Sequence, residues 1–456
     1  LTCSLVSCSI FAVIQLAVQL HSPVDLAYTG HSSSTRRASE LLSDSCRQMA
    51  RNFKITGVCI VGGGNAAHTF LALLPHVGTP NVRLYTAFEE EAQKISAGLE
   101  KDGGYISAEF ASHLHPSGII RGKPTCITTD PAEALDGVNV ILMPVPGFAY
   151  ESVFNTFKPH LQPGTMICVT PGQGGADWVA RRSLGKELLD QLTLFALIPM
   201  PFNCRITEYG HQVHVQAFNS HFLVAATNTA HAEECISIGH QLCQVGHEHE
   251  VTVTSIGHMI TASLLPVNPG IHPQRLYSML HHYKEGDVLP TNPLFYEEMT
   301  EEAVKLMEQT SDELQEIAKK LTADLNLPFH LLTILEAEQL TWPDGPNKAP
   351  MDLLTIFRTS TDYKGFRSPF IPVDNGFKPD FSNRYFTEDI PGGLCLYKGV
   401  AELLGIATPT IDRLIQWAQA HMGKEYVTPD HRLAGRNVPE TASPQAFGIN
   451  TTAGLV

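Results

Sequence analysis

The sequence lacks the cysteine spacings that are typical of metal sites and redox motifs. Its ten cysteines form no C-x-x-C pair, and none of them belongs to a Cys/His cluster with zinc-ligand spacing. Several, for example Cys59 and Cys168, lie inside apolar, strand-like runs. This usage is typical of reduced, buried thiols in a cytosolic protein rather than of a disulfide framework. We therefore expect neither a disulfide-stapled fold nor a metal site.

Positive charge is also in short supply. The formal net charge is −15 at pH 7, and such a chain repels phosphate backbones, so we expect no nucleic-acid partner. Charged residues make up only 17% of the chain and hydrophobic residues 43%, which predicts a globular protein rather than a disordered one. Because 456 residues are too many for one core, two domains are expected.

A convincing membrane-spanning run is missing as well. Residues 1–20 are apolar, but they lack a basic start and are interrupted by two glutamines, so they make a poor signal peptide and a poor membrane span. The chain begins with leucine, and Met49 comes just before the first clear strand. We expect residues 1–48 to be a non-structural leader or gene-model extension; a mitochondrial leader is the alternative.

What the chain does have is an alternation of short apolar strands and helices. Residues 55–61 are rich in Val and Ile, as in a parallel strand buried on both faces. Further strands are predicted at 82–86, 125–128, 138–143 and 166–170, with a helix at 89–100. The alternation predicts an α/β fold with a Rossmann-type doubly wound parallel sheet, which we place at residues 49–258.

The pattern changes after about residue 258. Long amphipathic helices then dominate, notably over residues 296–325. We therefore expect a second, C-terminal and mostly helical domain at residues 259–456.

A glycine-rich turn directly follows the first predicted strand and matches the dinucleotide pattern G-x-G-x-x-G/A. The first glycine permits the tight turn, the second lets backbone amides approach a pyrophosphate, and the small third residue lets helix and strand pack closely. The N-terminus of the helix that follows favours the phosphate charge. The residues expected to bind the cofactor here are Gly62, Gly63, Gly64, Asn65, Ala66 and Ala67.

The residues after the second strand bear on the choice between NAD(H) and NADP(H). Thr86 stands where such folds usually place an acid that binds the adenosine ribose. Glu89, Glu90 and Glu91 follow, with no Arg or Lys close behind. Because acidic surroundings disfavour a 2′-phosphate, we predict NAD(H).

Two loops rich in Pro and Gly end later strands of the predicted sheet, at residues 144–148 and 171–175. In a doubly wound sheet, ligands bind beyond the carboxyl ends of the strands. We expect Val145 and Pro146 to contact the cofactor and Gln173, a polar residue in a turn of small ones, to line the substrate cleft. Ordinary strand-to-helix turns would use the same Gly and Pro.

Two polar segments of the predicted helical domain are ambiguous by themselves. One contains His272, which would serve equally well as a packed or helix-capping residue. The other contains Arg384 and Asp389, which would also make an ordinary interdomain salt bridge.

Together, these motifs resemble the opine dehydrogenase family. The resemblance extends from about Lys54 to Asn450 and consists of short matches in the same order. The matching stretches are residues 62–68, 82–88, 145–149, 204–206 before Glu208, 383–391, 398–401, 417–418 and 423–426.

The resemblance implies a reaction and roles for particular residues. Members of the family join a 2-oxo acid, usually pyruvate, to the amino group of an amino acid, and NADH reduces the resulting imine to an N-(1-carboxyethyl) amino acid. His272 is then the expected general acid/base, Asp389 the carboxylate that orients it, and Arg384 a residue that grips a substrate carboxylate. Cys204, in one of the matching stretches, and Gln173 are expected to contact substrate.

The chain departs from the family pattern around the expected amino-acid pocket. Asn268-Pro269-Gly270 replaces the bulky and aromatic residues that precede the family's histidine. Residues 199–203 read Pro-Met-Pro-Phe-Asn where the family has Glu-Thr-Leu-Pro-Trp, and Trp342 does not align with the aromatic residue that helps to hold arginine. The amino acid is therefore left open between arginine, alanine, glycine and taurine.

Two other functions fit parts of the pattern. A 2-oxo acid or glycerol-phosphate-type NAD-dependent reductase shares the two-domain plan but usually places a catalytic lysine in the helical domain. An inactive NAD-binding sensor would not need His272, Arg384 and Asp389. Because the NADH pool is intracellular, we expect a cytoplasmic enzyme, monomeric like related enzymes, with small-molecule substrates and no membrane partner.

Overall fold

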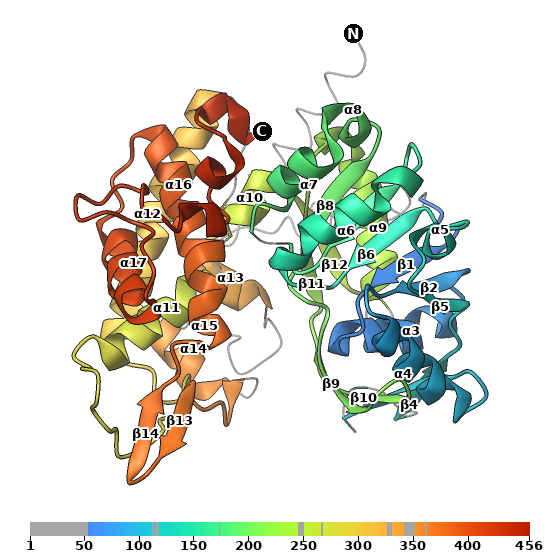
Figure 1. Ribbon diagram of the computed structural model, residues 1–456, viewed down its shortest axis with the longest axis horizontal. Coiled ribbons are helices and arrows are strands. Elements are labelled where there is room, and N and C mark those ends of the chain that lie inside the picture. The colour runs from blue at the N-terminus through green and yellow to red at the C-terminus, as the bar shows by residue number, and fades with distance from the viewer. Residues whose placement is uncertain are drawn as a thin grey trace, which may run out of the picture. The chain divides into compact units, whose positions relative to one another are not determined.

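The larger sheet of the protein has eight strands in the order β12-β11-β8-β7-β6-β1-β2-β5 (Figure 1). The strands are β1 (Val58–Val61), β2 (Val82–Tyr85), β5 (Cys126–Thr128), β6 (Val140–Met143), β7 (Met166–Val169), β8 (Thr193–Ile198), β11 (His221–Ala226) and β12 (Thr252–His258). Neighbouring strands run parallel except β8 and β11, which are antiparallel. The predicted doubly wound sheet is thus confirmed. Two strands, β11 and β12, run opposite to the other six, which the sequence did not indicate.

The structure is a computed structural model that describes residues 53–456, apart from 112–113, 115–117, 173, 245–249, 266–267, 326–330, 342–351 and 361–362. All described residues belong to one structural unit. The predicted leader at 1–48, Gln173 and Trp342 lie outside the described residues.

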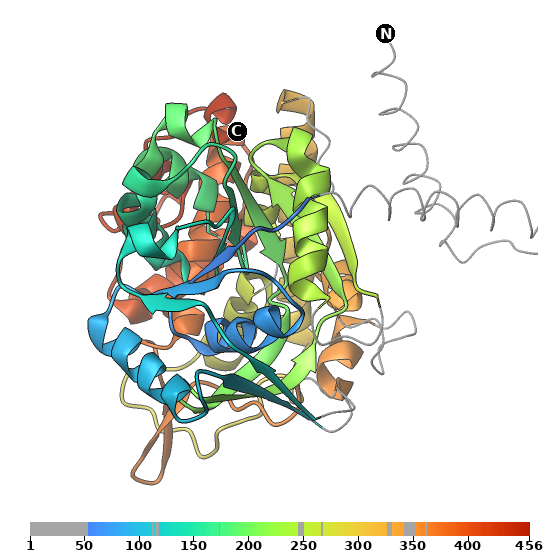
Figure 2. The same cartoon turned by 90° about the vertical axis from the view of Figure 1, so that its right-hand side faces the viewer.

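Helices cover both faces of the larger sheet (Figure 2). They are α3 (Asn65–His76), α4 (Glu89–Glu100), α5 (Pro131–Ala134), α6 (Tyr150–Phe157), α7 (Ala176–Leu184), α8 (Lys186–Leu189) and α9 (Ala232–Cys243). Side chains of β1 alternate between the two faces: Val58 and Ile60 pack with α3 and α9, whereas Cys59 and Val61 pack with α6 and α7. A strand covered on both faces needs no polar side, which explains the continuous apolar runs in the sequence.

A second sheet, with the order β4-β3-β10-β9, packs against α3. Its strands are β3 (Ile106–Phe110), β4 (Ile119–Gly122), β9 (Phe202–Glu208) and β10 (Gln212–Phe218). The contact with the helix is close, since a Cβ on Gly122 would clash with the Ala72 carbonyl oxygen. The alternation in the sequence did not predict β3 and β4, because β3 pairs with β10, which lies about a hundred residues further along the chain.

After β12 the chain is mostly helical, as predicted. The elements are α10 (Met259–Leu264), α11 (Asn268–Leu280), α12 (Glu301–Leu325), α13 (Ile334–Thr341), α14 (Leu353–Thr359), α15 (Arg384–Thr387), α16 (Cys395–Leu404) and α17 (Pro409–Met422), with a hairpin of β13 (Phe370–Val373) and β14 (Gly376–Pro379). One turn of π-helix, Ile390–Leu394, joins the segment after α15 to α16. Among the described residues, no helix combines the length and the apolar character needed to cross a membrane.

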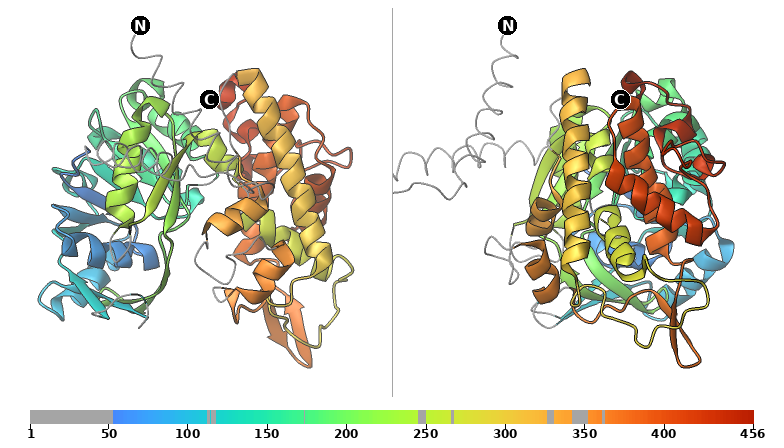
Figure 3. Two further views of the ribbon diagram at one scale, coloured as in Figure 1. Left: turned by 180° about the vertical axis from the view of Figure 1, so that it is seen from behind. Right: turned by 90° about the vertical axis from the view of Figure 1, so that its left-hand side faces the viewer.

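The long helix α12 organises this region, with α11, α16 and α17 packed along it (Figure 3). Its apolar face is buried, as the periodicity predicted. The predicted start near residue 296 is wrong by five residues. The helix begins at Glu301 because the Thr300 hydroxyl accepts a hydrogen bond from the Ala303 amide at 3.2 Å and thereby caps the first turn.

Candidate active site

A cavity of about 680 Å³ is lined by residues from both the sheet region and the helical region. Several residues predicted from the sequence meet there, although they come from distant parts of the chain. They are Asn65, Ala66, Val145, Pro146, Cys204, Arg384 and Asp389. This convergence makes the cavity the candidate active site.

The glycine turn has the geometry that a bound pyrophosphate requires. Gly62 has φ +89°, a conformation that side chains disfavour, and its amide donates to the Tyr85 carbonyl at 2.8 Å. A Cβ on Gly62 would lie 2.8 Å from Cγ1 of Val145, whereas a Cβ on Gly64 would meet no atom within 4 Å. The turn therefore presents open backbone just before α3, whose N-terminus favours anions. These residues fit a dinucleotide.

Two side chains hold this turn in place. The Asn65 side-chain oxygen accepts from the Ile206 amide of β9 at 2.8 Å. His68 Nδ1 lies 3.1 Å from the Gly64 carbonyl, and its Nε2 accepts from the Gly210 amide at 2.9 Å. Burial lowers the pKa of His68, which keeps the ring neutral. Sequence reasoning missed this structural role of His68; the only available signal was its place within a matching stretch.

Thr86 lies where it was predicted, directly after β2, but it is buried. Its hydroxyl donates to the Glu91 carboxylate. The Thr86 hydroxyl therefore already donates its proton within the protein and has none left to donate to a ligand.

His272 and Asp389 form the buried pair that the resemblance implied. His272 Nδ1 lies 2.7 Å from Asp389 Oδ2, although 117 residues separate them. The two are 2% and 7% exposed. A carboxylate only accepts hydrogen bonds, so the pair places the proton on Nδ1 and leaves Nε2 with its lone pair when the ring is neutral.

The second nitrogen of His272 is also engaged. Nε2 lies 2.9 Å from the Tyr296 hydroxyl, and the Tyr385 ring stacks on the imidazole at 3.8 Å between centroids. Burial and the neighbouring Tyr385 and Glu338 raise the pKa of Tyr296 well above its usual value, so this hydroxyl stays protonated and donates to Nε2. His272 is not among the residues that line the cavity, whereas Asp389 is. No sequence pattern pointed to Tyr296.

Arg384 begins α15 and lines the cavity. Its nearest carboxylate in the described structure is that of Glu388, at 3.9 Å, and the alternative of a salt bridge with Asp389 is not formed. Its side chain is 58% exposed. A guanidinium held this loosely keeps its planar fork available for a carboxylate ligand.

Cys204 lines the cavity through a largely buried side chain. Burial raises the pKa of its thiol, which keeps it protonated and unreactive as a nucleophile. The neighbouring segment, where the sequence departs from the family pattern, adds Met200, Phe202 and Asn203 to the lining. This wall of the cavity therefore carries no carboxylate.

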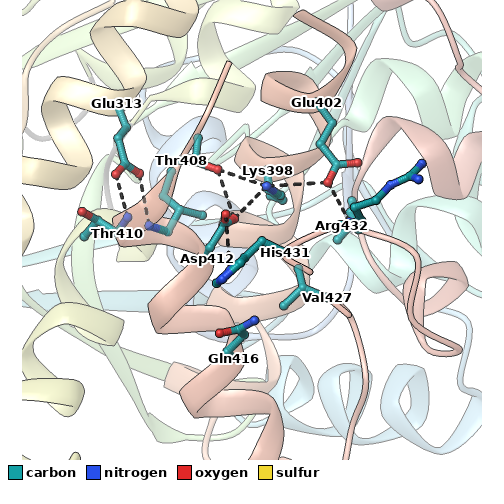
Figure 4. Close-up of polar contacts among 12 residues, drawn as sticks. Glu313, Lys398, Glu402, Thr408, Thr410, Asp412, Gln416, Val427, His431 and Arg432 are labelled. Carbon is teal, nitrogen blue, oxygen red and sulfur yellow. Dashed lines mark hydrogen bonds and ion pairs between the residues drawn. The ribbon is translucent and has the colours of Figure 1, made fainter. Parts of the chain in front are cut away.

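Lys398, the lysine of one matching stretch, does not line the cavity but is part of a buried ion-pair network (Figure 4). Its Nζ lies 2.8 Å from Asp412 Oδ1, 3.6 Å from Glu402 Oε1 and 3.4 Å from the Thr408 hydroxyl. The described lining of the cavity contains three arginines but no lysine. This argues against a reductase that depends on a catalytic lysine. The described residues also contain no group of three or more His, Cys, Asp or Glu placed to hold a metal ion.

Comparisons with known proteins agree with this arrangement. Residues 255–422 match the α-helical domain of NAD/NADP octopine/nopaline dehydrogenases. A tauropine dehydrogenase from Arabella iricolor is 31% identical over 398 residues, which are 86% of this chain and 98% of that protein. The octopine dehydrogenase of Pecten maximus is 31% identical over 400 residues, 86% of this chain and 97% of the relative.

Solved structures show the same likeness. Octopine dehydrogenase with NADH and L-arginine matches with a TM-score of 0.77 at 30% identity, over 88% of this chain and 97% of that one. The same enzyme with NADH and pyruvate gives a TM-score of 0.74 at 29% identity, over 87% and 96%. The chain therefore belongs to the opine dehydrogenase family, NAD(H)-dependent oxidoreductases that act on CH–NH groups.

Proposed function

We propose that this protein catalyses the reversible reductive condensation of pyruvate, or a related 2-oxo acid, with an L-amino acid, giving an N-(1-carboxyethyl) amino acid. The observation that carries the proposal is the buried His272–Asp389 pair beside a cavity that Arg384 also lines, together with Asn65 and Ala66 from the end of the glycine turn. An inactive NAD-binding protein would have no need of a histidine hydrogen-bonded to a buried carboxylate at that place.

The cofactor is expected to lie along the sheet side of the cavity. Gly62, Gly64 and the start of α3 would hold the pyrophosphate, while Val145 and Pro146 would border the nicotinamide half. NADH, when bound, supplies the hydride that reduces the imine.

The chain's own residues would perform the condensation. Arg384 would hold the 2-oxo acid by its carboxylate while the amino nitrogen bonds to the keto carbon, and loss of the resulting hydroxyl as water leaves the imine. Water loss needs a proton at that hydroxyl, which His272 would deliver while Asp389 stabilises its charged ring. Before this, His272 Nε2 must exchange its hydrogen bond with Tyr296 for one with the substrate.

The charges around the cavity favour an amino acid without a cationic side chain. Two of the four lining carboxylates are paired with a cation, Glu151 with Arg182 at 2.8 Å and Glu440 with Lys424 at 2.6 Å, and Asp389 is hydrogen-bonded to His272. The fourth, Glu388, lies beside Arg384. An arginine side chain would find only one loosely paired acid, Glu388, which lies beside the positive charge of Arg384, so we propose alanine, glycine or taurine.

The test is NADH oxidation with pyruvate and a panel of alanine, glycine, taurine and arginine, with product identified by mass spectrometry. Oxidation should require both substrates and should be fastest with one of the first three. Equal oxidation with pyruvate alone would refute the condensation and favour a simple 2-oxo acid reductase. If arginine is the best amino-acid substrate, only the argument from the cavity charges is refuted, and the condensation itself still stands.

We further propose that the division between the dinucleotide-binding and substrate domains lies at residues 258 and 259, where β12 gives way to α10. Because the reaction consumes NADH, a cytoplasmic enzyme is also proposed, and a monomer would suffice since one chain supplies every residue named above. Size-exclusion chromatography with light scattering tests the monomer.

A further inference from the structure

Glu91 lies against the glycine turn although it belongs to α4. A Cβ placed on Gly63 would come within 2.5 Å of Glu91 Cδ. The Tyr209 hydroxyl, between β9 and β10, lies 2.9 Å from Glu91 Oε1 and 3.1 Å from the Gly63 carbonyl, and the Thr86 hydroxyl donates to Oε2. The carboxylate is thus held at the turn by groups from two other parts of the fold.

The other two acids of this segment face elsewhere. Glu89 accepts hydrogen bonds from Gln93 and Thr129, both at 3.0 Å. Glu90 pairs with Lys94 at 2.7 Å and is 80% exposed. Of the three glutamates, only Glu91 contacts the residues around the turn. The three acids are therefore not equivalent with respect to a cofactor bound there.

Folds of this kind bind the adenosine ribose through an acid near the end of the second strand. Here Thr86 occupies that end, but it is buried and its hydroxyl proton is directed to Glu91. A carboxylate has about four lone-pair positions, so Glu91 can accept from Thr86 and Tyr209 and still accept from a ribose. Burial and the Glu91 charge raise the pKa of Tyr209, which keeps its hydroxyl protonated as a donor.

We propose that Glu91, positioned by Thr86 and Tyr209, binds the 2′-hydroxyl of the adenosine ribose and is the residue that excludes a 2′-phosphate. Thr86 is then a positioning residue and not itself the ribose ligand. The nearby cations are already engaged in the described structure: Lys94 with Glu90 and Arg83 with Asp136. A 2′-phosphate would therefore meet the Glu91 charge without a compensating cation.

The test measures cofactor binding directly, by the fluorescence of bound NADH and NADPH, without a 2-oxo acid or an amino acid. Glu91→Gln removes the charge while keeping the shape. We expect it to weaken NADH binding about tenfold, as for the loss of a charge-assisted hydrogen bond, and to narrow the preference for NADH over NADPH by about tenfold or more. Failure of the proposed condensation would leave this result intact.

Two further variants separate charge from position. Tyr209→Phe keeps the Glu91 charge but removes a group that aims it, so NADH binding should weaken severalfold while NADPH stays excluded. Glu90→Gln removes a neighbouring charge and should change the NADH/NADPH preference less than twofold.

If a folded Glu91→Gln protein keeps the wild-type preference for NADH over NADPH, the proposal is overturned. It is also overturned if Glu90→Gln weakens that preference as much as Glu91→Gln does. Circular dichroism melting establishes folding. If Glu91→Gln does not fold, Glu91→Asp takes its place: it withdraws the carboxylate by one methylene, and unchanged NADH binding there would overturn the proposal.

Discussion

The hydrogen bond between Tyr296 and His272 yields a prediction that the structure makes quantitative. Tyr296→Phe removes a buried hydroxyl 2.9 Å from Nε2 and leaves the ring's packing on Tyr363 in place. The hydroxyl donates to Nε2, so it stabilises only the form of His272 in which that nitrogen carries a lone pair. Its removal should therefore favour protonation at Nε2.

A net buried hydrogen bond contributes about 0.5–1.5 kcal/mol, and one pH unit corresponds to about 1.36 kcal/mol. The acidic limb of the kcat/KM profile should thus move to higher pH by about 0.4–1.1 units in Tyr296→Phe. We choose the direction that oxidises the opine product with NAD⁺, because there the histidine acts as a base and must begin unprotonated.

The matched control is Tyr277→Phe. Tyr277 belongs to α11, like His272, but its ring packs against Trp417 and His281. Tyr277→Phe should therefore leave the pH profile of kcat/KM unchanged. A Tyr296→Phe profile that stays within about 0.2 units of the wild type, or moves to lower pH, would refute the assignment of Tyr296 as the donor and Nε2 as the acceptor.

Three further predictions concern the cavity and two buried charged residues. Arg384→Lys keeps the charge but loses the bidentate fork, so the KM for pyruvate should rise about tenfold or more with little change in NADH binding. Lys398→Met leaves the buried carboxylate of Asp412 without its cation and should lower the free energy of unfolding by about 3–5 kcal/mol in urea titrations, whereas the double variant Lys398→Met/Asp412→Leu should recover much of this loss. Burial raises the pKa of Asp177 to about 6 from 3.8, so its contribution to stability is complete below pH 3.8 and is lost as the pH rises through 6. That difference corresponds to about 3 kcal/mol, and Asp177→Asn should remove this part of the stability loss across pH 4–6.

Each of these has a contrary outcome. An unchanged KM in Arg384→Lys would mean that charge alone, or another residue, binds the carboxylate. A double variant no more stable than Lys398→Met would deny that the unpaired Asp412 causes the loss. Parallel stability curves for Asp177→Asn and the wild type between pH 4 and 7 would show that Asp177 does not titrate there.

Features encoded by neighbouring residues could be predicted from the sequence. The strand β1, the glycine turn and the start of α3 follow one another in the chain, and their pattern depends on local backbone geometry and burial on both faces. The helix α4 was predicted with its observed bounds, and the buried face of α12 followed from its periodicity. Strands β3 and β4 were missed because their pairing depends on β10, whose position is set by the folded sheet.

The site divides in the same way. The glycine pattern predicted a dinucleotide-binding turn, and the resemblance to a family singled out His272, Arg384 and Asp389. The contacts between these groups follow from the folded chain: His272 is joined to Asp389, Tyr296 contacts the other nitrogen of His272, and the Thr86 hydroxyl donates to Glu91. Motifs read along the chain report local backbone geometry, whereas hydrogen bonds and charge pairing depend on distances of about 3 Å between segments that only folding brings together.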